Sequence, residues 1–217
     1  MTERRIAAAC MAFAFTGWAH AVEQPAVSEP TPGCGTFQYD REHIGPLDYR
    51  RIHPKTLKLV EDFHFSRPVE MLRKGQSSSI GGDLAYTLNA IPNHPRALRS
   101  TIEYFRRNGL QAAREMRMGL ECWMDRAVAY RPDDPLVRIL VADELIKSGK
   151  RDEAVSHLRV AEQNAGNSAT IHYNLGLLYL DLKNYDQSVE HARKAYELGA
   201  PLPGLKNMLA EAGKWRE

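Results

Sequence analysis

Small and apolar residues recur at helical spacing between residues 169 and 200, with polar residues at the positions between them. The pattern breaks once, at Lys183 and Asn184. Small side chains let two helices approach closely, so the pattern predicts two antiparallel helices packed against each other. The positions that carry this pattern are Leu175, Gly176, Tyr179, Ser188, Ala192 and Ala195.

The same pattern returns at a stride of 34 residues. One stride before Ala195 is Ala161, and one stride before that is Ala127. In the same frame, Gly176 corresponds to Ala142. A single hairpin cannot bury its apolar face alone, so a repeated hairpin predicts a stacked array in which each unit covers the next.

This stride, with small residues at fixed positions, resembles the tetratricopeptide repeat family, whose unit is about 34 residues long. The resemblance covers residues 95–213 and implies an all-α, tetratricopeptide-like solenoid of helical hairpins. We expect units near residues 95–134, 135–168 and 169–202, followed by a capping helix at 203–213. The first unit is six residues longer than the others, and we expect the extra residues to lengthen its second helix, over 110–130.

Proline and capping residues mark several helix starts. Asp134 precedes Pro135, and His94 precedes Pro95, which predicts capped helices beginning at these prolines. The array extends back to residue 83, where Asp83 is expected to cap a helix that ends near Ala90. Before it, residues 34–82 predict an irregular segment with short helices, one of them over 54–64.

The first 21 residues have the features of a secretory signal peptide. Arg4 and Arg5 precede an apolar run over 6–19, and the small residues Ala19 and Ala21 flank His20 at a cleavage site. We therefore expect cleavage near Ala21, a flexible proline-rich leader over 22–33, and a periplasmic or secreted protein. The apolar run is too short to span a bilayer comfortably, and an uncleaved N-terminal anchor is the alternative.

Charge and cysteine content limit the class of partner and the cellular compartment that we expect. The chain has 29 basic and 27 acidic residues, so it offers no broad positive field for nucleic acid. Cys10 leaves with the signal peptide, and Cys34 and Cys122 remain. In the oxidising compartment that export implies, these two are expected to form a disulfide; two free thiols are the alternative.

The family resemblance implies that the first helix of each unit lines a concave groove that holds another protein. The groove would be basic at its first unit and apolar further on, which suits an extended segment with an acidic group at one end. A merely solvated basic helix face is the alternative. The residues that the family resemblance assigns to this groove are Arg96, Arg99, Glu103, Arg106, Ile139, Asp143, Thr170, Tyr173, Asn174 and Leu177.

Other chemistry finds little support in the sequence. It contains no nucleophile elbow, phosphate-binding loop or zinc-protease helix, so we expect neither an enzyme nor a cofactor. The alternative function is a metal- or redox-handling envelope protein that uses Cys34 with His43, His53 and His64. A further possibility is that the N-terminal segment fills the groove. The favoured hypothesis is a non-enzymatic scaffold or adaptor in a bacterial envelope, within a secretion or assembly complex.

Overall fold

The computed structural model describes residues 27–37 and 44–216 of the 217-residue chain. The signal peptide predicted at 1–21 and His43 lie outside these residues. Within them the chain forms eleven α-helices and no strand, none of them both long and apolar enough to cross a membrane. The helices are α1 (Pro54–His64), α2 (Arg67–Glu70), α3 (Ile80–Ala90), α4 (Pro95–Asn108), α5 (Leu110–Met116), α6 (Leu120–Tyr130), α7 (Pro135–Lys147), α8 (Arg151–Gln163), α9 (Ala169–Asp181), α10 (Tyr185–Glu197) and α11 (Gly204–Glu211).

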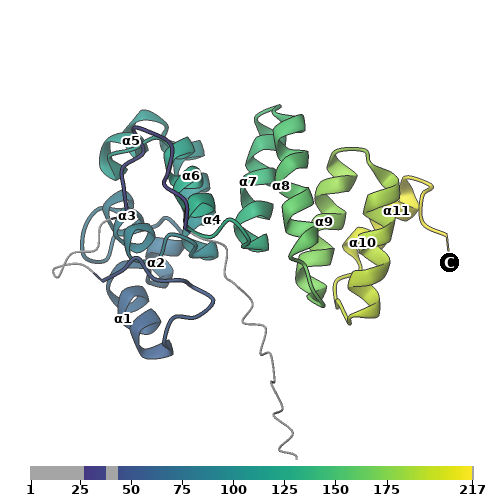
Figure 1. Ribbon diagram of the computed structural model, residues 1–217, viewed down its shortest axis with the longest axis horizontal. Coiled ribbons are helices and arrows are strands. Elements are labelled where there is room, and N and C mark those ends of the chain that lie inside the picture. The colour runs from purple at the N-terminus through teal and green to yellow at the C-terminus, as the bar shows by residue number, and fades with distance from the viewer. Residues whose placement is uncertain (1–26, 38–43, 217) are drawn as a thin grey trace, which may run out of the picture.

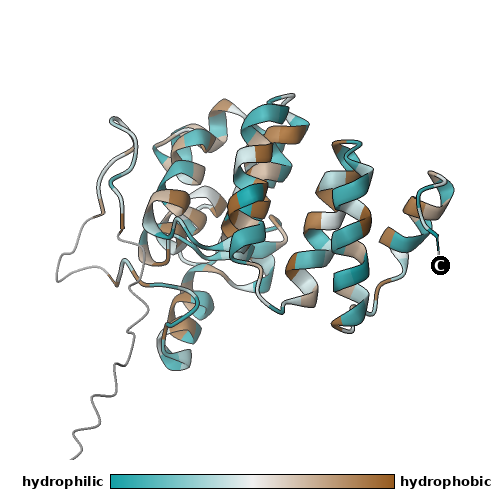
Figure 2. Ribbon diagram, turned by 45° about the vertical axis from the view of Figure 1, so that its right-hand side comes forward, coloured by the Kyte–Doolittle hydropathy of each residue, from teal (hydrophilic) through white to brown (hydrophobic). Residues whose placement is uncertain are grey.

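The helices form a one-dimensional array, as the sequence predicted. In Figure 1 the chain progresses from α1 at one side to α11 at the other, with α7 to α11 following one another in order. Helix α7 pairs with α8 and α9 pairs with α10, while α4, α7 and α9 contact one another in succession. The helices carry both apolar and polar residues along their length (Figure 2). The fold is therefore an all-α stack of helical hairpins.

The small residues lie where the 34-residue stride places them. Ala127, Ala161 and Ala195 occupy α6, α8 and α10, and each is fully buried. In the last hairpin the Ser188 hydroxyl donates to the Gly176 carbonyl oxygen at 2.7 Å. The close approach of α9 and α10 at Gly176 explains why this position has no side chain.

The proline-marked helix starts are capped. Asp134 accepts hydrogen bonds from the backbone N–H groups of Leu136 and Val137, at 3.0 and 3.3 Å. His94 Nδ1 accepts from the N–H of Ala97 at 3.2 Å. These side chains satisfy N–H groups that the first turn of a helix leaves unpaired.

The first unit differs from the expectation of one lengthened second helix over 110–130. The chain breaks after Met116, with Arg117 in the left-handed region at φ 62°, and restarts after Gly119 as α6. A continuous helix of that length would extend to about 30 Å, well beyond α4 at about 21 Å. The break instead folds α5 over α3 and α4, where Ala112 and Met116 are buried.

The helix expected to start at Asp83 begins earlier. Ser79 is its N-cap, and its hydroxyl accepts from the Gly82 N–H at 3.1 Å. Asp83 lies one turn inside and is fully buried. Its carboxylate accepts hydrogen bonds from the N–H groups of Gln76 and Ser77, so it organises the preceding loop instead of capping α3.

Candidate protein-binding groove

A cavity of about 470 Å³ lies across the first helices of successive units, α4, α7 and α9, and reaches α11. We call this surface the groove. Seven of the ten residues that the sequence placed in it line the cavity: Arg99, Glu103, Arg106, Ile139, Asp143, Asn174 and Leu177. The other lining residues are Ile102, Leu140, Lys147, Leu178, Asp181 and Met208.

The groove has an apolar centre. Ile139 and Leu178 are largely buried and belong to the main hydrophobic core, so they form part of a rigid floor. Leu177 is partly exposed, and Met208 on α11 is 40 % exposed. An apolar side chain entering the groove would therefore find apolar surface that still faces solvent.

Arg96 does not lie in the groove. Its guanidinium forms hydrogen bonds with Glu70 at 2.8 and 2.6 Å and a further one with Glu61 at 3.2 Å. These contacts lower the pKa of Glu70 and fasten α1 and α2 to α4. The family resemblance that implied a groove position for Arg96 could not show that α1 and α2 would engage this side chain.

Tyr173 and Thr170 also lie outside the cavity lining. The Tyr173 hydroxyl accepts a hydrogen bond from the Leu205 N–H at 3.2 Å, so α11 covers the ring. Thr170 is exposed in the first turn of α9, and its carbonyl accepts from the Asn174 amide at 2.9 Å. Neither side chain therefore contributes to the groove.

Ion pairs neutralise much of the charge predicted at the first unit. Arg106 pairs with Glu144 on α7 and lies 3.9 Å from Glu103. On α7, Lys147 donates to Asp143 at 2.6 Å. The groove is therefore not simply basic at one end, because its arginine nearest α7 already has carboxylate partners.

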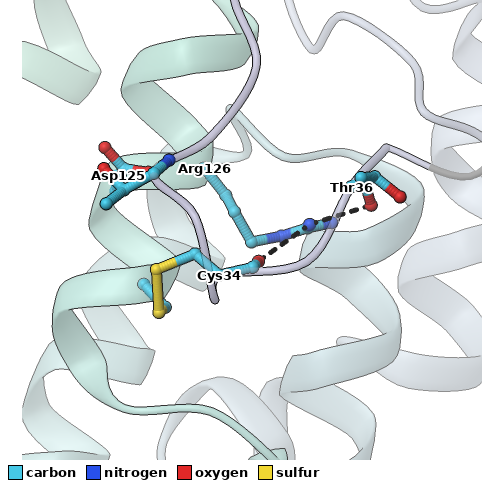
Figure 3. Close-up of a disulfide and its surroundings, with 6 residues drawn as sticks. Cys34, Thr36, Asp125 and Arg126 are labelled. Atoms are coloured by element: carbon cyan, nitrogen blue, oxygen red, sulfur yellow. Dashed lines mark hydrogen bonds between the residues drawn. A yellow bond between two sulfur atoms is a disulfide. The ribbon is translucent and has the colours of Figure 1, made fainter.

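The predicted disulfide is present. Cys34 and Cys122 are joined, with their Cα atoms 4.9 Å apart, and the bond ties the N-terminal segment to α6 (Figure 3). Beside it the buried Arg126 donates to the carbonyl oxygen of Thr36 at 3.1 Å. Its guanidinium also packs over the Phe37 ring, 5.0 Å from the ring centroid. None of these residues lines the groove.

The described part of the N-terminal segment does not fill the groove. Ser28 donates through its N–H to the Ala129 carbonyl oxygen at 2.9 Å, and the Thr31 N–H donates to Asp125 at 2.6 Å. These contacts run along α6, and neither residues 27–37 nor 44–53 line the cavity across α4, α7 and α9.

A second anchoring cluster was missed by sequence reasoning. Asp48 accepts hydrogen bonds from Asn93 at 2.8 Å and Arg131 at 2.6 Å, and Asn93 also donates to Asp134 at 2.9 Å. Burial tends to raise the pKa of Asp48, but these hydrogen bonds and those of Arg50 outweigh it and lower that pKa well below its usual value. Asn93 and Asp133 lie 40 residues apart, and each stands two residues before a proline that starts a helix. This spacing was the sequence feature that pointed to the cluster.

The histidines proposed for an alternative metal site are separated. His53 caps the start of α1 by accepting from the Lys55 N–H at 3.2 Å, while His64 at its other end contacts Asp83 at 3.1 Å. The helix between them spans about 16 Å. Across residues 27–37 and 44–216, no three histidine, cysteine or acidic side chains are grouped so that they could hold a metal ion.

Two histidines of the last hairpin are in contact. His172 on α9 and His191 on α10 approach to 3.0 Å between their Nδ1 atoms, and His191 Nε2 contacts Glu162 on α8 at 2.8 Å. One stride earlier, Arg138 contacts His157 at 3.2 Å. These pairs occupy equivalent places in successive hairpins, so they belong to the packing of the array.

Residues 169–199, which span α9 and α10, match the tetratricopeptide repeat. The chain contains a tetratricopeptide repeat. No curated protein matches the chain. The tetratricopeptide hairpin and its stacked neighbours indicate a scaffold for protein–protein interaction, a role that such repeats generally perform without catalysis.

Proposed function

We propose that this chain is an exported, non-enzymatic adaptor that holds an extended segment or helix of a partner protein in the groove. The observation that carries the proposal is the cavity shared by α4, α7, α9 and α11. It combines a rigid apolar floor with charged side chains at its margins. Peptide-binding grooves use this combination to provide affinity from the apolar centre and register from the charges.

Two observations support export to a periplasmic or extracellular compartment. Residues 1–21 have the sequence features of a cleaved signal peptide, and Cys34 is joined to Cys122. Disulfides persist in oxidising compartments and are rare where thiols are kept reduced. Mass analysis of the protein from its native host should give a chain that begins at Val22 and has no free thiol; a chain that retains Met1 would contradict export by cleavage.

Site-specific crosslinking in the native host tests the adaptor role. A photo-activatable amino acid in place of Asn174 samples the groove, and the same amino acid in place of the exposed Lys194 on α10 samples the opposite helix layer. We expect one or a few defined proteins to crosslink from position 174 and not from 194. Adding Leu177→Arg should abolish these crosslinks while the protein stays folded. Equal crosslinks from both positions, or none from 174, would contradict the proposal.

A further inference from the structure

The charges of the groove are graded from one helix to the next. Of the residues that line it, α4 contributes two arginines and one glutamate, α7 contributes one lysine and one aspartate, and α9 contributes only an aspartate. The lining is therefore net positive at α4, neutral at α7 and net negative at α9. Such an arrangement can select a partner by the order of its charges.

Most of these charges already have partners inside the protein. Arg106 pairs with Glu144, Glu103 with Arg107 at 2.7 Å, and Lys147 with Asp143. Charges that are paired within the groove offer little to a ligand. The charges that remain available decide what the groove recognises.

Two groove side chains form no ion pair within the described parts of the chain: Arg99 on α4 and Asp181 on α9. Both are exposed. Partial burial, together with the negative charge of Asp143, raises the pKa of Asp181 above its usual value. Lys147 and Arg151 offset part of this effect. A further cation beside Asp181 would reduce the repulsion from Asp143 that remains.

The distance between these two charges fixes the length of segment that could reach both. Arg99 lies near the start of α4 and Asp181 at the end of α9. Two helix-to-helix steps of about 9 Å and about 12 Å along the helices give a diagonal of about 20 Å. An extended chain covers about 3.3 Å per residue, so six or seven residues span it.

We propose that the groove binds an extended partner segment of six or seven residues with an acidic side chain at Arg99, a basic side chain at Asp181, and apolar side chains between them. This inference rests on the proposed adaptor function and makes it specific. The apolar part would lie over Ile139, Leu177 and Met208. The sequence alone indicated an acidic end only; the basic end follows from the position of Asp181.

Synthetic peptides with blocked ends and an alternating Leu–Ala centre test the proposal. One carries Asp and Lys at its two ends, one carries Asp at both, and one carries Lys at both. With the mature full-length protein, fluorescence polarisation should show the mixed peptide binding about two- to fivefold more tightly than either of the others, as expected for exposed ion pairs. Raising the salt concentration should reduce this preference.

Single charge reversals should change the preferred peptide. Arg99→Glu leaves acidic groups at both ends of the groove, so the peptide with two lysines should become the tightest. Asp181→Lys should favour the peptide with two aspartates. Lys194→Glu, which changes the charge on α10 outside the groove, should leave the order of the wild-type protein unchanged.

The outcomes separate this inference from the function on which it rests. If all three peptides bind in the same order to wild-type, Arg99→Glu and Asp181→Lys proteins, the charge order plays no part and the inference is overturned. If Leu177→Arg still removes that binding, the adaptor function survives. Absence of binding by every peptide also overturns the inference, whereas the adaptor function fails only when position 174 yields no specific crosslink.

Discussion

The two ends of the array are held together by different interactions. The N-terminal region, which comprises residues 27–37 and 44–130, is fastened by contacts between residues far apart in sequence, such as Cys34 with Cys122 and Asp48 with Asn93. The C-terminal region, residues 135–211, repeats short-range contacts, such as Arg138 with His157, and contains no disulfide. Regular repeats stabilise themselves through their neighbours, whereas the irregular first units need additional fastening.

This difference assigns separate roles to the two regions. The disulfide and the Asp48 cluster hold the N-terminal segment on the side of α6 and on the loop before α4, away from the groove. The groove itself crosses from one region to the other, because α4 belongs to the first and α7 and α9 to the second. Stability of the N-terminal region should therefore influence only one end of the groove.

The largest expected effect comes from removing the disulfide. Cys34→Ser combined with Cys122→Ser opens a loop of 88 residues. The chain-entropy estimate for such a loop is about 4 to 5 kcal/mol of unfolding free energy. Trp123 reports on the N-terminal region and Trp215 on the C-terminal end, so denaturant unfolding of single-tryptophan variants should show a larger loss at Trp123. Equal losses at both tryptophans would mean that the regions unfold as one unit.

A smaller effect is expected at the junction of the regions. Asp134→Ala removes the cap of α7 and also removes one of the two carboxylates to which the buried Asn93 amide donates. We expect a loss of about 2 to 3 kcal/mol. Ser168→Ala is the matched change in the C-terminal region, where the cap of α9 has no such second contact, and should cost about 1 kcal/mol. Equal values in urea unfolding would contradict the additional role of Asp134.

Gly176→Ala probes close packing within the C-terminal region. A Cβ atom at this position would lie 2.5 Å from Leu205 Cδ2, so the buried Leu205 side chain, or the helix α11 that carries it, must shift. Overpacking of this kind costs about 1 to 3 kcal/mol. The loss should appear at Trp215 and leave Trp123 unchanged. An unchanged unfolding midpoint at Trp215 would show that α11 is not closely packed on α9.

The smallest expected effect is a dependence on pH. Burial and the nearby charge of Arg138 lower the pKa of His157 from 6.5 to about 4. Folding therefore favours the neutral form of His157. Its contribution to the free energy of unfolding is complete above pH 6.5 and is lost as the pH falls towards 4. Between pH 7 and 5.5 the loss should be about 1 kcal/mol. His157→Gln should remove this part of the pH dependence; an identical profile for both proteins would contradict it.

The C-terminal region could be predicted from the sequence and the N-terminal region only in part. A repeat stride places Ala127, Ala161 and Ala195 on equivalent helices because the helices of each unit pack against one another in the same way. The sequence also contained a signal for the contacts of these side chains, because Arg138 and His157 stand one 34-residue stride before His172 and His191. The contacts of Arg96 could not be predicted from the repeat. Its partners Glu61 and Glu70 lie outside the regular repeats, and no period relates them to α4.

Methyl NMR of the mature protein, recorded with the Asp–Lys peptide, tests most directly whether the first helices form the recognition surface. We expect shifts at the methyl groups of Ile139 on α7 and Leu177 on α9, with Val128 on α6 and Val155 on α8 unchanged. Shifts centred on Val128 and Val155 would contradict it, because the binding surface would then lie on the second helices.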